Sequence, residues 1–209
     1  MKLLILGATG GTGLQLVRQS LELNHEVAVL TRNRSKLNHT HERLTVLEGN
    51  VLDEKILLKA LEGKDAVLSA LGRGKSLNSS NLISKAVSTL IPAMNATGVK
   101  RVVFLSSFGV GQTFRQANFI QKIIFRTFLR DIYADKARAD ERICSSSLEW
   151  TLVHPVALTN APFTGTYIVG EKLPMKGLPK ISRADVAHFM LLQLNDPGFL
   201  RKTIIVSTN

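Results

Sequence analysis

The sequence predicts an α/β fold with a doubly wound parallel sheet, in a single domain spanning residues 1–209. Three observations predict it. Short apolar runs alternate with amphipathic runs along the chain, which is typical of parallel strands joined by helices. Several of the apolar runs contain almost no polar residue, as expected for strands buried on both faces. The first apolar run leads directly into a glycine-rich turn.

This turn follows the apolar run 3–6 and has the sequence Gly-Ala-Thr-Gly-Gly-Thr-Gly at 7–13. Gly7 is expected to leave the strand at positive φ, Gly10 to let a diphosphate approach the backbone, and Gly13 to bring the next helix close to the strand. The pattern predicts the dinucleotide-binding turn of a Rossmann-type fold. The alternative is a helix that simply begins in a glycine-rich turn. The predicted cofactor residues of the turn are Gly7, Thr9, Gly10, Gly11, Thr12 and Gly13.

The remaining elements follow from the same alternation of patterns. Asp53 is placed to cap the second helix at its N-terminus, and Gly98 is placed to end the third. The expected strands are 3–6, 26–31, 44–48, 66–70, 101–106, 150–154 and 203–206. The expected helices are 11–23, 54–61, 81–97, a long helical region over 114–146, and 183–194.

Two segments depart from the alternation. Residues 155–181 are rich in glycine and proline and are expected to form loops with one short strand at most. Because binding residues concentrate on loops held by a rigid sheet, this segment is expected to be a small substrate-facing flap. The second segment is 119–130, where apolar positions at helical spacing predict a basic amphipathic helix. Lys122, Arg126 and Arg130 lie opposite its apolar positions. Such a helix packs over the core of its own protein or over the entrance of a binding site, or else it binds a membrane surface or a partner.

The composition and the charge bear on which partners the chain would bind. The chain has 27 basic and 16 acidic residues and a net charge of +11, which would attract nucleic acid. However, the basic residues are spread along the chain, and neither an aromatic RNA-binding motif nor zinc-ligand spacing accompanies them. No nucleic-acid partner and no metal site are therefore expected.

Other features bear on the compartment and the assembly. Cys144 is the single cysteine, so an intrachain disulfide is impossible and a reducing compartment is favoured. No apolar stretch is long enough to span a bilayer. These features predict a cytoplasmic protein without a transmembrane segment, and we expect a monomer or homodimer.

The end of the second predicted strand indicates which coenzyme is bound. A carboxylate there would accept hydrogen bonds from the ribose of NAD, whereas an arginine pairs with the 2′-phosphate of NADP. Here the run 30–36 contains Arg32 and no carboxylate. The guanidinium of Arg32 can stack on adenine and bind the 2′-phosphate. The sequence thus predicts NADP(H) in preference to NAD(H), the alternative being a solvated basic loop.

Taken together, these motifs resemble the atypical short-chain dehydrogenase/reductases, and among them the branch of flavin reductase and biliverdin-IXβ reductase. The resemblance covers essentially the whole chain and implies an NAD(P)H-binding Rossmann-type fold. The order of the motifs is more specific than any single one of them. The motifs are Gly-Ala-Thr-Gly-Gly-Thr-Gly at 7–13, Leu-Thr-Arg at 30–32, Gly-Asn-Val-Leu-Asp at 49–53, Ala-Leu-Gly at 70–72, Leu-Ser-Ser-Phe-Gly at 105–109, Thr-Gly-Thr-Tyr at 164–167 and Ala-Asp-Val-Ala-His-Phe-Met at 184–190.

The resemblance also implies further coenzyme contacts. The segment containing Asn50 and Val51 would lie against the adenine, with Asn50 in place of the more usual aspartate; the alternative for Asn50 is a simple Asx turn. A second segment would pass under the nicotinamide ribose and the diphosphate. The predicted residues of that segment are Ala70, Leu71, Gly72 and Arg73. Ser106 and Pro155 complete the predicted coenzyme site.

The candidate catalytic residues depart from the pattern of typical short-chain dehydrogenases. Those enzymes combine a serine with a Tyr-x-x-x-Lys helix, whereas here Tyr133 and Lys136 are spaced i, i+3. This spacing favours a structural role for Tyr133. The flavin/biliverdin branch does not need the tyrosine, and the resemblance implies that Ser107 assists the reaction. The histidine of that branch aligns with Ala157; His154 lies nearby and is a candidate donor or a buried structural histidine.

The sequence therefore predicts an NADPH-dependent reductase that transfers hydride to a flavin, a quinone or a similar planar, tetrapyrrole-like acceptor. Loss of a protein acid is better tolerated with such acceptors than with simple ketones. The rival hypothesis is a catalytically weak NAD(P)H-binding sensor. A sugar-nucleotide epimerase is a third hypothesis, disfavoured because such enzymes generally need the intact tyrosine motif and a larger C-terminal domain.

Overall fold

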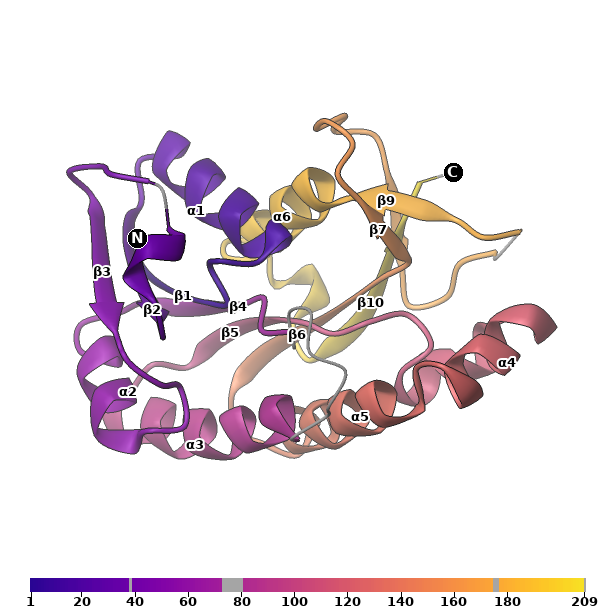
Figure 1. The fold of residues 1–209 in the computed structure, drawn as a ribbon, viewed down its shortest axis with the longest axis horizontal. Coiled ribbons are helices and arrows are strands. Elements are labelled where there is room, and N and C mark those ends of the chain that lie inside the picture. The colour runs from indigo at the N-terminus through magenta and orange to yellow at the C-terminus, as the bar shows by residue number, and fades with distance from the viewer. Residues whose placement is uncertain (38, 73–80, 175–176, 209) are drawn as a thin grey trace.

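A computed structural model describes residues 1–37, 39–72, 81–174 and 177–208 (Figure 1). Within these residues, eight strands form one sheet. Across the sheet, the strands are β3 (Leu44–Glu48), β2 (Glu26–Thr31), β1 (Lys2–Leu6), β4 (Ala66–Ser69), β5 (Arg101–Leu105), β6 (Glu149–Pro155), β10 (Lys202–Ser207) and β8 (Ile168–Gly170).

The sheet is parallel from β3 to β10, and only its edge strand β8 runs antiparallel, against β10. The central strand β1 pairs on both sides, with Leu3 opposite Val27 of β2 and Ala66 of β4. The order of connections therefore reverses at β1. In an open parallel sheet, ligands bind at such a reversal, at the carboxyl ends of the strands.

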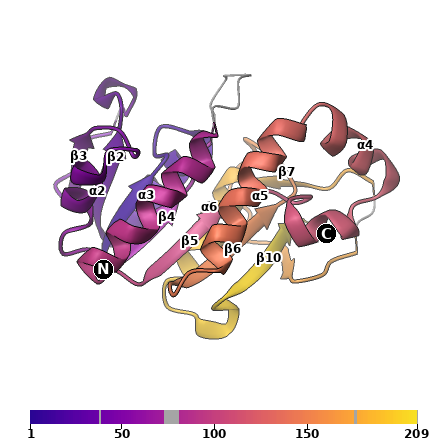
Figure 2. The ribbon, with the colours of Figure 1, turned by 90° about the horizontal axis from the view of Figure 1, so that it is seen from below.

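Helices cover both faces of the sheet, which confirms the doubly wound α/β fold. Figure 1 shows α1 (Gly11–Glu22) and α6 (Arg183–Leu192) on one face. On the opposite face, turned toward the viewer in Figure 2, lie α2 (Glu54–Leu61), α3 (Leu82–Thr97) and α5 (Arg130–Cys144).

Alternate residues of each strand point to opposite faces, so the sheet contributes to two apolar layers. Leu3 and Ile5 of β1 pack with Leu16 of α1 in one layer. Leu4 and Leu6 belong to the other layer, which includes residues of α2, α3 and α5. Burial on both faces explains why this strand is apolar throughout.

The expected helix ends are confirmed at two positions. The Asp53 side chain accepts a hydrogen bond from the Ile56 amide at 3.2 Å and so caps α2. Gly98 ends α3 in the left-handed conformation, with φ +75°.

The prediction of one long helical region over 114–146 is wrong, because the structure divides it into separate elements. It contains part of a 3-10 helix (Gly111–Gln116), then α4 (Phe119–Thr127) and α5. The side chain of Asn118 accepts a hydrogen bond from the Gln121 amide, and the Gln121 side chain accepts one from the Asn118 amide, each at 2.9 Å. This capping box starts α4 as a new helix.

Residues 155–181 are more regular than expected. The segment contains β7 (Ala157–Thr159), β8 and the start of β9 (Lys180–Ser182), so the expectation of at most one short strand is wrong. β7 and β9 pair in a second, two-stranded sheet, and β8 extends the main sheet. Each of these strands is only three residues long, too short for a clear periodic pattern.

Across the described ranges, no helix combines the length and the apolar character needed to cross a bilayer.

Candidate functional site

A cavity of about 530 Å³ opens where the order of strands reverses, at the carboxyl ends of β1, β2, β3 and β4. It brings together nine of the predicted coenzyme residues from four separate segments. These residues are Gly7, Thr9, Gly10, Arg32, Asn50, Val51, Ala70, Leu71 and Gly72.

Two glycines bring the walls of this cavity close together. Gly7 has φ +77°, and a Cβ there would overlap the carbonyl oxygen of Ala70 and lie 2.8 Å from the Leu71 amide nitrogen. A Cβ on Gly13 would overlap the Gly7 carbonyl oxygen. Larger residues at either position would therefore push apart the turn, the helix α1 and the end of β4.

Helix α1 begins within this turn, so its N-terminus faces the cavity. Gly10 is its N-cap, and among the described residues no side chain caps the helix. The first turn contains no acidic residue. Unpaired backbone N–H groups and the positive end of the helix dipole thus favour an anion here, as a diphosphate requires.

The opposite end of the cavity is cationic. Arg32 and Lys36 both line it, and the described lining residues include no carboxylate. Lys36 belongs to a one-turn 3-10 helix (Arg34–Lys36) that the Asn33 side chain caps by accepting a hydrogen bond from the Ser35 amide. This part of the cavity therefore presents two positive charges, which favour an anionic group.

Asn50 lines the cavity but forms the Asx turn that was the alternative for it. Its Oδ1 accepts a hydrogen bond from the Leu52 amide at 3.1 Å. The Asn50 carbonyl accepts a second one from the Asp53 amide at 2.9 Å. The carbonyl group of the side chain is therefore engaged in the turn, and an adenine contact through the amide group stays a prediction.

Other predicted coenzyme residues lie outside the lining of this cavity. Gly13 contacts Gly7, as described above, and Thr12 is buried. Gly11 lies under the side chain of Arg183, whose Cδ is 2.6 Å from where a Cβ would stand. Pro155 is buried at the end of β6, where its carbonyl accepts a hydrogen bond from the Phe108 amide. Arg73 lies outside the described residues.

Ser106 is not positioned to bind a coenzyme through its side chain. It is buried, and its hydroxyl donates to Asp140 Oδ2 at 2.8 Å. The hydroxyl of its neighbour Ser107 contacts the same helix one turn earlier, at Lys136. Sequence position alone did not separate the two serines.

Ser107 and Lys136 are in direct contact. Lys136 Nζ donates to Ser107 Oγ at 2.6 Å and to the Ser106 carbonyl at 2.9 Å. Burial lowers the pKa of the Lys136 ammonium to about 8, although the carboxylates of Asp140 and Asp135 act in the opposite direction. Ser107 follows β5, and Lys136 belongs to α5. β5 is the neighbour of β4, whose carboxyl end leads into the segment 70–72 that lines the cavity. Neither Ser107 nor Lys136 is among the described lining residues.

Two contacts hold the side chain of Tyr133. Its hydroxyl donates to the Phe108 carbonyl at 3.0 Å, and its ring stacks on Phe125 with 4.8 Å between centroids. Burial raises the pKa of the phenol to about 12. The group is thus held by the turn after β5 and is a poor proton donor near neutral pH.

His154 is buried between two polar side chains. It is 1% exposed, with Nδ1 3.0 Å from Thr113 Oγ1 and Nε2 3.0 Å from Asp140 Oδ2. It borders a different cavity, of about 400 Å³, between α5 and the strands β6 and β10. It is not among the described residues that line the cavity at the reversal of strand order.

Asp185 holds part of the predicted flap against α6. Its carboxylate accepts hydrogen bonds from the amides of Thr164 and Gly165, both at 2.9 Å, and from the hydroxyls of Thr164 and Ser182. Burial alone would raise the pKa of this carboxyl, but the hydrogen bonds outweigh burial and lower the pKa. The turn at Thr164 is therefore fixed to the same helix that carries Arg183.

Sequence reasoning missed two cations. Lys36 could have been found, because it lies in the same basic run as Arg32. Arg183 gave no local signal, since its contact with Gly11 joins distant parts of the chain. Its guanidinium donates to Asn160 Oδ1 at 2.7 Å, which places a positive charge beside the start of α1. The missed lining residues are Ala8, Leu30, Thr31, Asn33, Lys36, Gly49 and Leu82.

Comparison with known proteins agrees with this geometry. The family described as NAD(P)H-binding matches residues 7–197. The photosystem II assembly factor Ycf39 of Synechocystis is 34% identical over 109 residues, covering 51% of this chain. The chain spans only 33% of that factor, and 64% of the same-named factor of Guillardia theta.

Two solved structures share the fold across nearly the whole chain. The anaerobilin reductase ChuY of Escherichia coli O157:H7 is 19% identical, with a TM-score of 0.81, and covers 99% of this chain and 96% of its own. A short-chain dehydrogenase/reductase of Veillonella parvula in complex with NADP is 21% identical, with a TM-score of 0.80, covering 98% and 93%. At these identities, the likeness establishes the fold.

Proposed function

This chain belongs to the NAD(P)H-binding family, and from that premise we propose that it is an NADPH-dependent reductase acting on a planar, conjugated acceptor. The acceptor classes that fit the proposal are a flavin, a quinone or a tetrapyrrole-like molecule.

One observation carries the choice of coenzyme. The cavity at the reversal of strand order combines an uncapped helix N-terminus with Arg32 and Lys36, and no described carboxylate lines it. The backbone groups of the glycine turn would bind the diphosphate, and the two cations would bind the 2′-phosphate. The Veillonella neighbour in complex with NADP supports the same assignment.

The proposed chemistry requires little of the protein besides orientation. When bound, NADPH supplies the hydride, and a planar acceptor takes it up if it is held in a suitable orientation. Residues 155–181 would cover the acceptor, with the Thr164 turn fixed by Asp185. A related fold serves as an anaerobilin reductase in Escherichia coli, which supports an acceptor of this class.

Ser107 and Lys136 would supply the proton that accompanies the hydride. Because Lys136 donates to Ser107 Oγ, the serine proton is free to point toward an acceptor. A proton that Ser107 gives up can then be replaced from the Lys136 ammonium. The lowered pKa of Lys136, about 8, makes that ammonium a better acid than an ordinary lysine.

A sensor that binds the coenzyme without catalysis is the second candidate. The contacts of two candidate acids support it. The Tyr133 hydroxyl is bound to the Phe108 carbonyl, and His154 is buried against Asp140. The Ser107–Lys136 pair is the observation against the sensor.

The test is turnover of NADPH with FMN, a soluble quinone and biliverdin, followed by loss of NADPH absorbance. We expect turnover with at least one acceptor, and a slower rate for Ser107→Ala. Ser106→Ala is an unsuitable control because its hydroxyl supports Asp140, so Ser147→Ala, exposed in the turn before β6, serves as the control. Tight binding of NADPH with no turnover across the panel would establish the sensor instead.

A further inference from the structure

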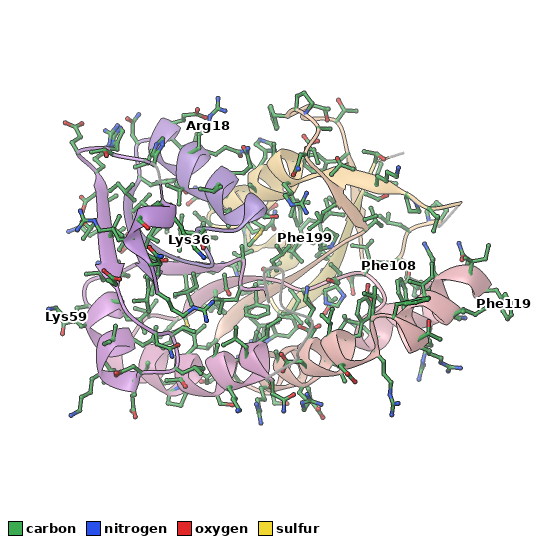
Figure 3. The ribbon with its side chains drawn as sticks, in the orientation of Figure 1. Arg18, Lys36, Lys59, Phe108, Phe119 and Phe199 are labelled. Atoms are coloured by element: carbon green, nitrogen blue, oxygen red, sulfur yellow. The ribbon has the colours of Figure 1, made fainter. Side chains whose placement is uncertain are left out.

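Helix α4 exposes several apolar residues, which bears on the alternatives that its sequence pattern left open. Of the described large apolar side chains, the three most exposed all belong to α4 or to the residue after it: Phe128 at 85%, Phe119 at 78% and Ile120 at 63%. Ile123, one turn after Phe119, is also exposed. Figure 3 shows Phe119 at the outer end of α4, pointing away from the body of the protein.

The inner side of α4 is firmly attached, so this orientation is fixed by contacts. Phe125 stacks on Tyr133 and lies so close to Gly109 that a Cβ there would overlap its ring. Gln121 is 5% exposed and closes the capping box with Asn118. The helix thus buries a glutamine and one phenylalanine and presents Phe119, Ile120 and Ile123 to solvent.

Positive charge surrounds the exposed apolar residues. Between residues 111 and 134 the chain has four cations, Arg115, Lys122, Arg126 and Arg130, and one carboxylate, Asp131. The Arg126 guanidinium lies 5.1 Å from the centroid of the Phe114 ring, which holds its charge beside the helix. Exposed aromatic and aliphatic side chains flanked by lysine and arginine are the features of an interfacial helix.

We infer that α4 and Phe128 form a docking surface for an anionic lipid bilayer. The apolar side chains Phe119, Ile120, Ile123 and Phe128 would enter the boundary between headgroups and acyl chains, and the flanking cations would pair with anionic headgroups. The inference does not depend on the proposed reductase activity.

Charge favours a bilayer over a second copy of this chain. A symmetric contact between two α4 helices would bring the four cations of one copy against the same four of the other. Each copy also has a net charge of +11. Repulsion between like charges opposes that contact, whereas the same charges attract an anionic surface.

The test is sedimentation of the full chain with lipid vesicles. We expect the protein to sediment with vesicles of phosphatidylcholine and phosphatidylglycerol and to stay in solution with phosphatidylcholine alone. The variant Phe119→Ser/Phe128→Ser should lose roughly tenfold or more in affinity for the anionic vesicles. Lys122→Glu/Arg130→Glu should remove the preference for anionic lipid.

The matched control is Leu23→Ser/Leu192→Ser, which removes two exposed apolar side chains at the ends of α1 and α6, on the other face of the sheet from α5. It should sediment as the unmodified protein does. The inference is overturned if the unmodified protein binds neither kind of vesicle, or if the α4 variant and the control behave alike. It is also overturned if light scattering shows a dimer that only the α4 variant dissociates, without vesicle binding.

Discussion

At the scale of single residues, the positions of three cations decide how the coenzyme binds and where a proton comes from. Arg32 and Lys36 give one end of the coenzyme cavity a positive charge, and Lys136 has a lowered pKa beside Ser107. Both features lead to predictions that separate a functional role from a structural one.

Replacing Arg32 by glutamine should weaken binding of NADPH and leave binding of NADH almost unchanged. Hydrogen bonds to a charged group contribute about 1.5–3 kcal/mol, so the dissociation constant of NADPH should rise roughly tenfold or more. Calorimetric titration of both coenzymes measures the change. Arg34→Gln is the matched control, because Arg34 belongs to the same basic turn but is absent from the described lining. Equal losses for both coenzymes would contradict the role of Arg32.

The pKa of Lys136, about 8, predicts how turnover depends on pH. If the ammonium replenishes the proton of Ser107, the protonated form is the active one, and kcat should fall as pH rises through about 8. Lys136→Met should lower kcat by roughly 10- to 100-fold and remove this limb of the profile. Tyr133→Phe should keep the limb, because the Tyr133 hydroxyl binds the Phe108 carbonyl. A limb that survives in Lys136→Met would exclude the proton role.

At the scale of elements, close contacts between strands, turns and helices hold the site together. The turn after β1 lies against both the end of β4 and the start of α1. The flap is bound to α6 through one buried carboxylate, Asp185.

Gly13→Ala tests the contact between the turn and α1. The new Cβ would overlap the Gly7 carbonyl oxygen, and backbone must shift to accommodate it. Overpacking of this kind costs about 1–3 kcal/mol, or roughly 2–4 °C in Tm for each kcal/mol in a domain of this size. Gly72→Ala is the control, since no described atom lies within 4 Å of its Cβ position. An unchanged Tm for Gly13→Ala would show that α1 does not approach the turn so closely.

Asp185→Asn tests the attachment of the flap to α6. The amide cannot accept all the hydrogen bonds that the carboxylate takes from Thr164, Gly165 and Ser182, so we expect a loss of about 2–3 kcal/mol in the free energy of unfolding. Asp53→Asn, which has one capping bond at the start of α2, should cost less, about 1 kcal/mol or below. Denaturant unfolding measures both variants, and similar losses in the two would contradict the account.

The Asp185 carboxylate also makes the free energy of unfolding depend on pH. Its pKa is lowered on folding, so the stability it contributes is complete above the ordinary carboxyl pKa and is lost as pH falls through the lowered value. The difference in the free energy of unfolding between the unmodified protein and Asp185→Asn should therefore shrink only in acid, at a pH below the usual pKa of an aspartate.

At the scale of the whole molecule, the sequence predicted the main sheet, and nine of the predicted coenzyme residues line one cavity at its carboxyl edge. Nearly continuous apolar runs identified strands such as β1. Glycines at positions where a Cβ would overlap the backbone, such as Gly7 and Gly13, identified the turn between β1 and α1. These signals are local, so a single sequence contains them in full.

The parts that the sequence did not predict depend on contacts between distant residues. Arg183 meets Gly11, and His154 meets Asp140, through packing that no local pattern records. The orientation of α4 is another such case. Its apolar pattern fits a buried face, but Phe125 is the residue that packs on Tyr133, and Phe119 is left in solvent.

The central claim is that the turn at residues 7–13 binds the diphosphate of NADPH while Arg32 and Lys36 bind its 2′-phosphate. A crystal structure of the chain grown with excess NADPH tests it most directly. The account predicts the diphosphate at the N-terminus of α1 and the 2′-phosphate within hydrogen-bonding distance of both cations. A structure with NADPH bound elsewhere, or with the cavity unfilled at saturating NADPH, would contradict it.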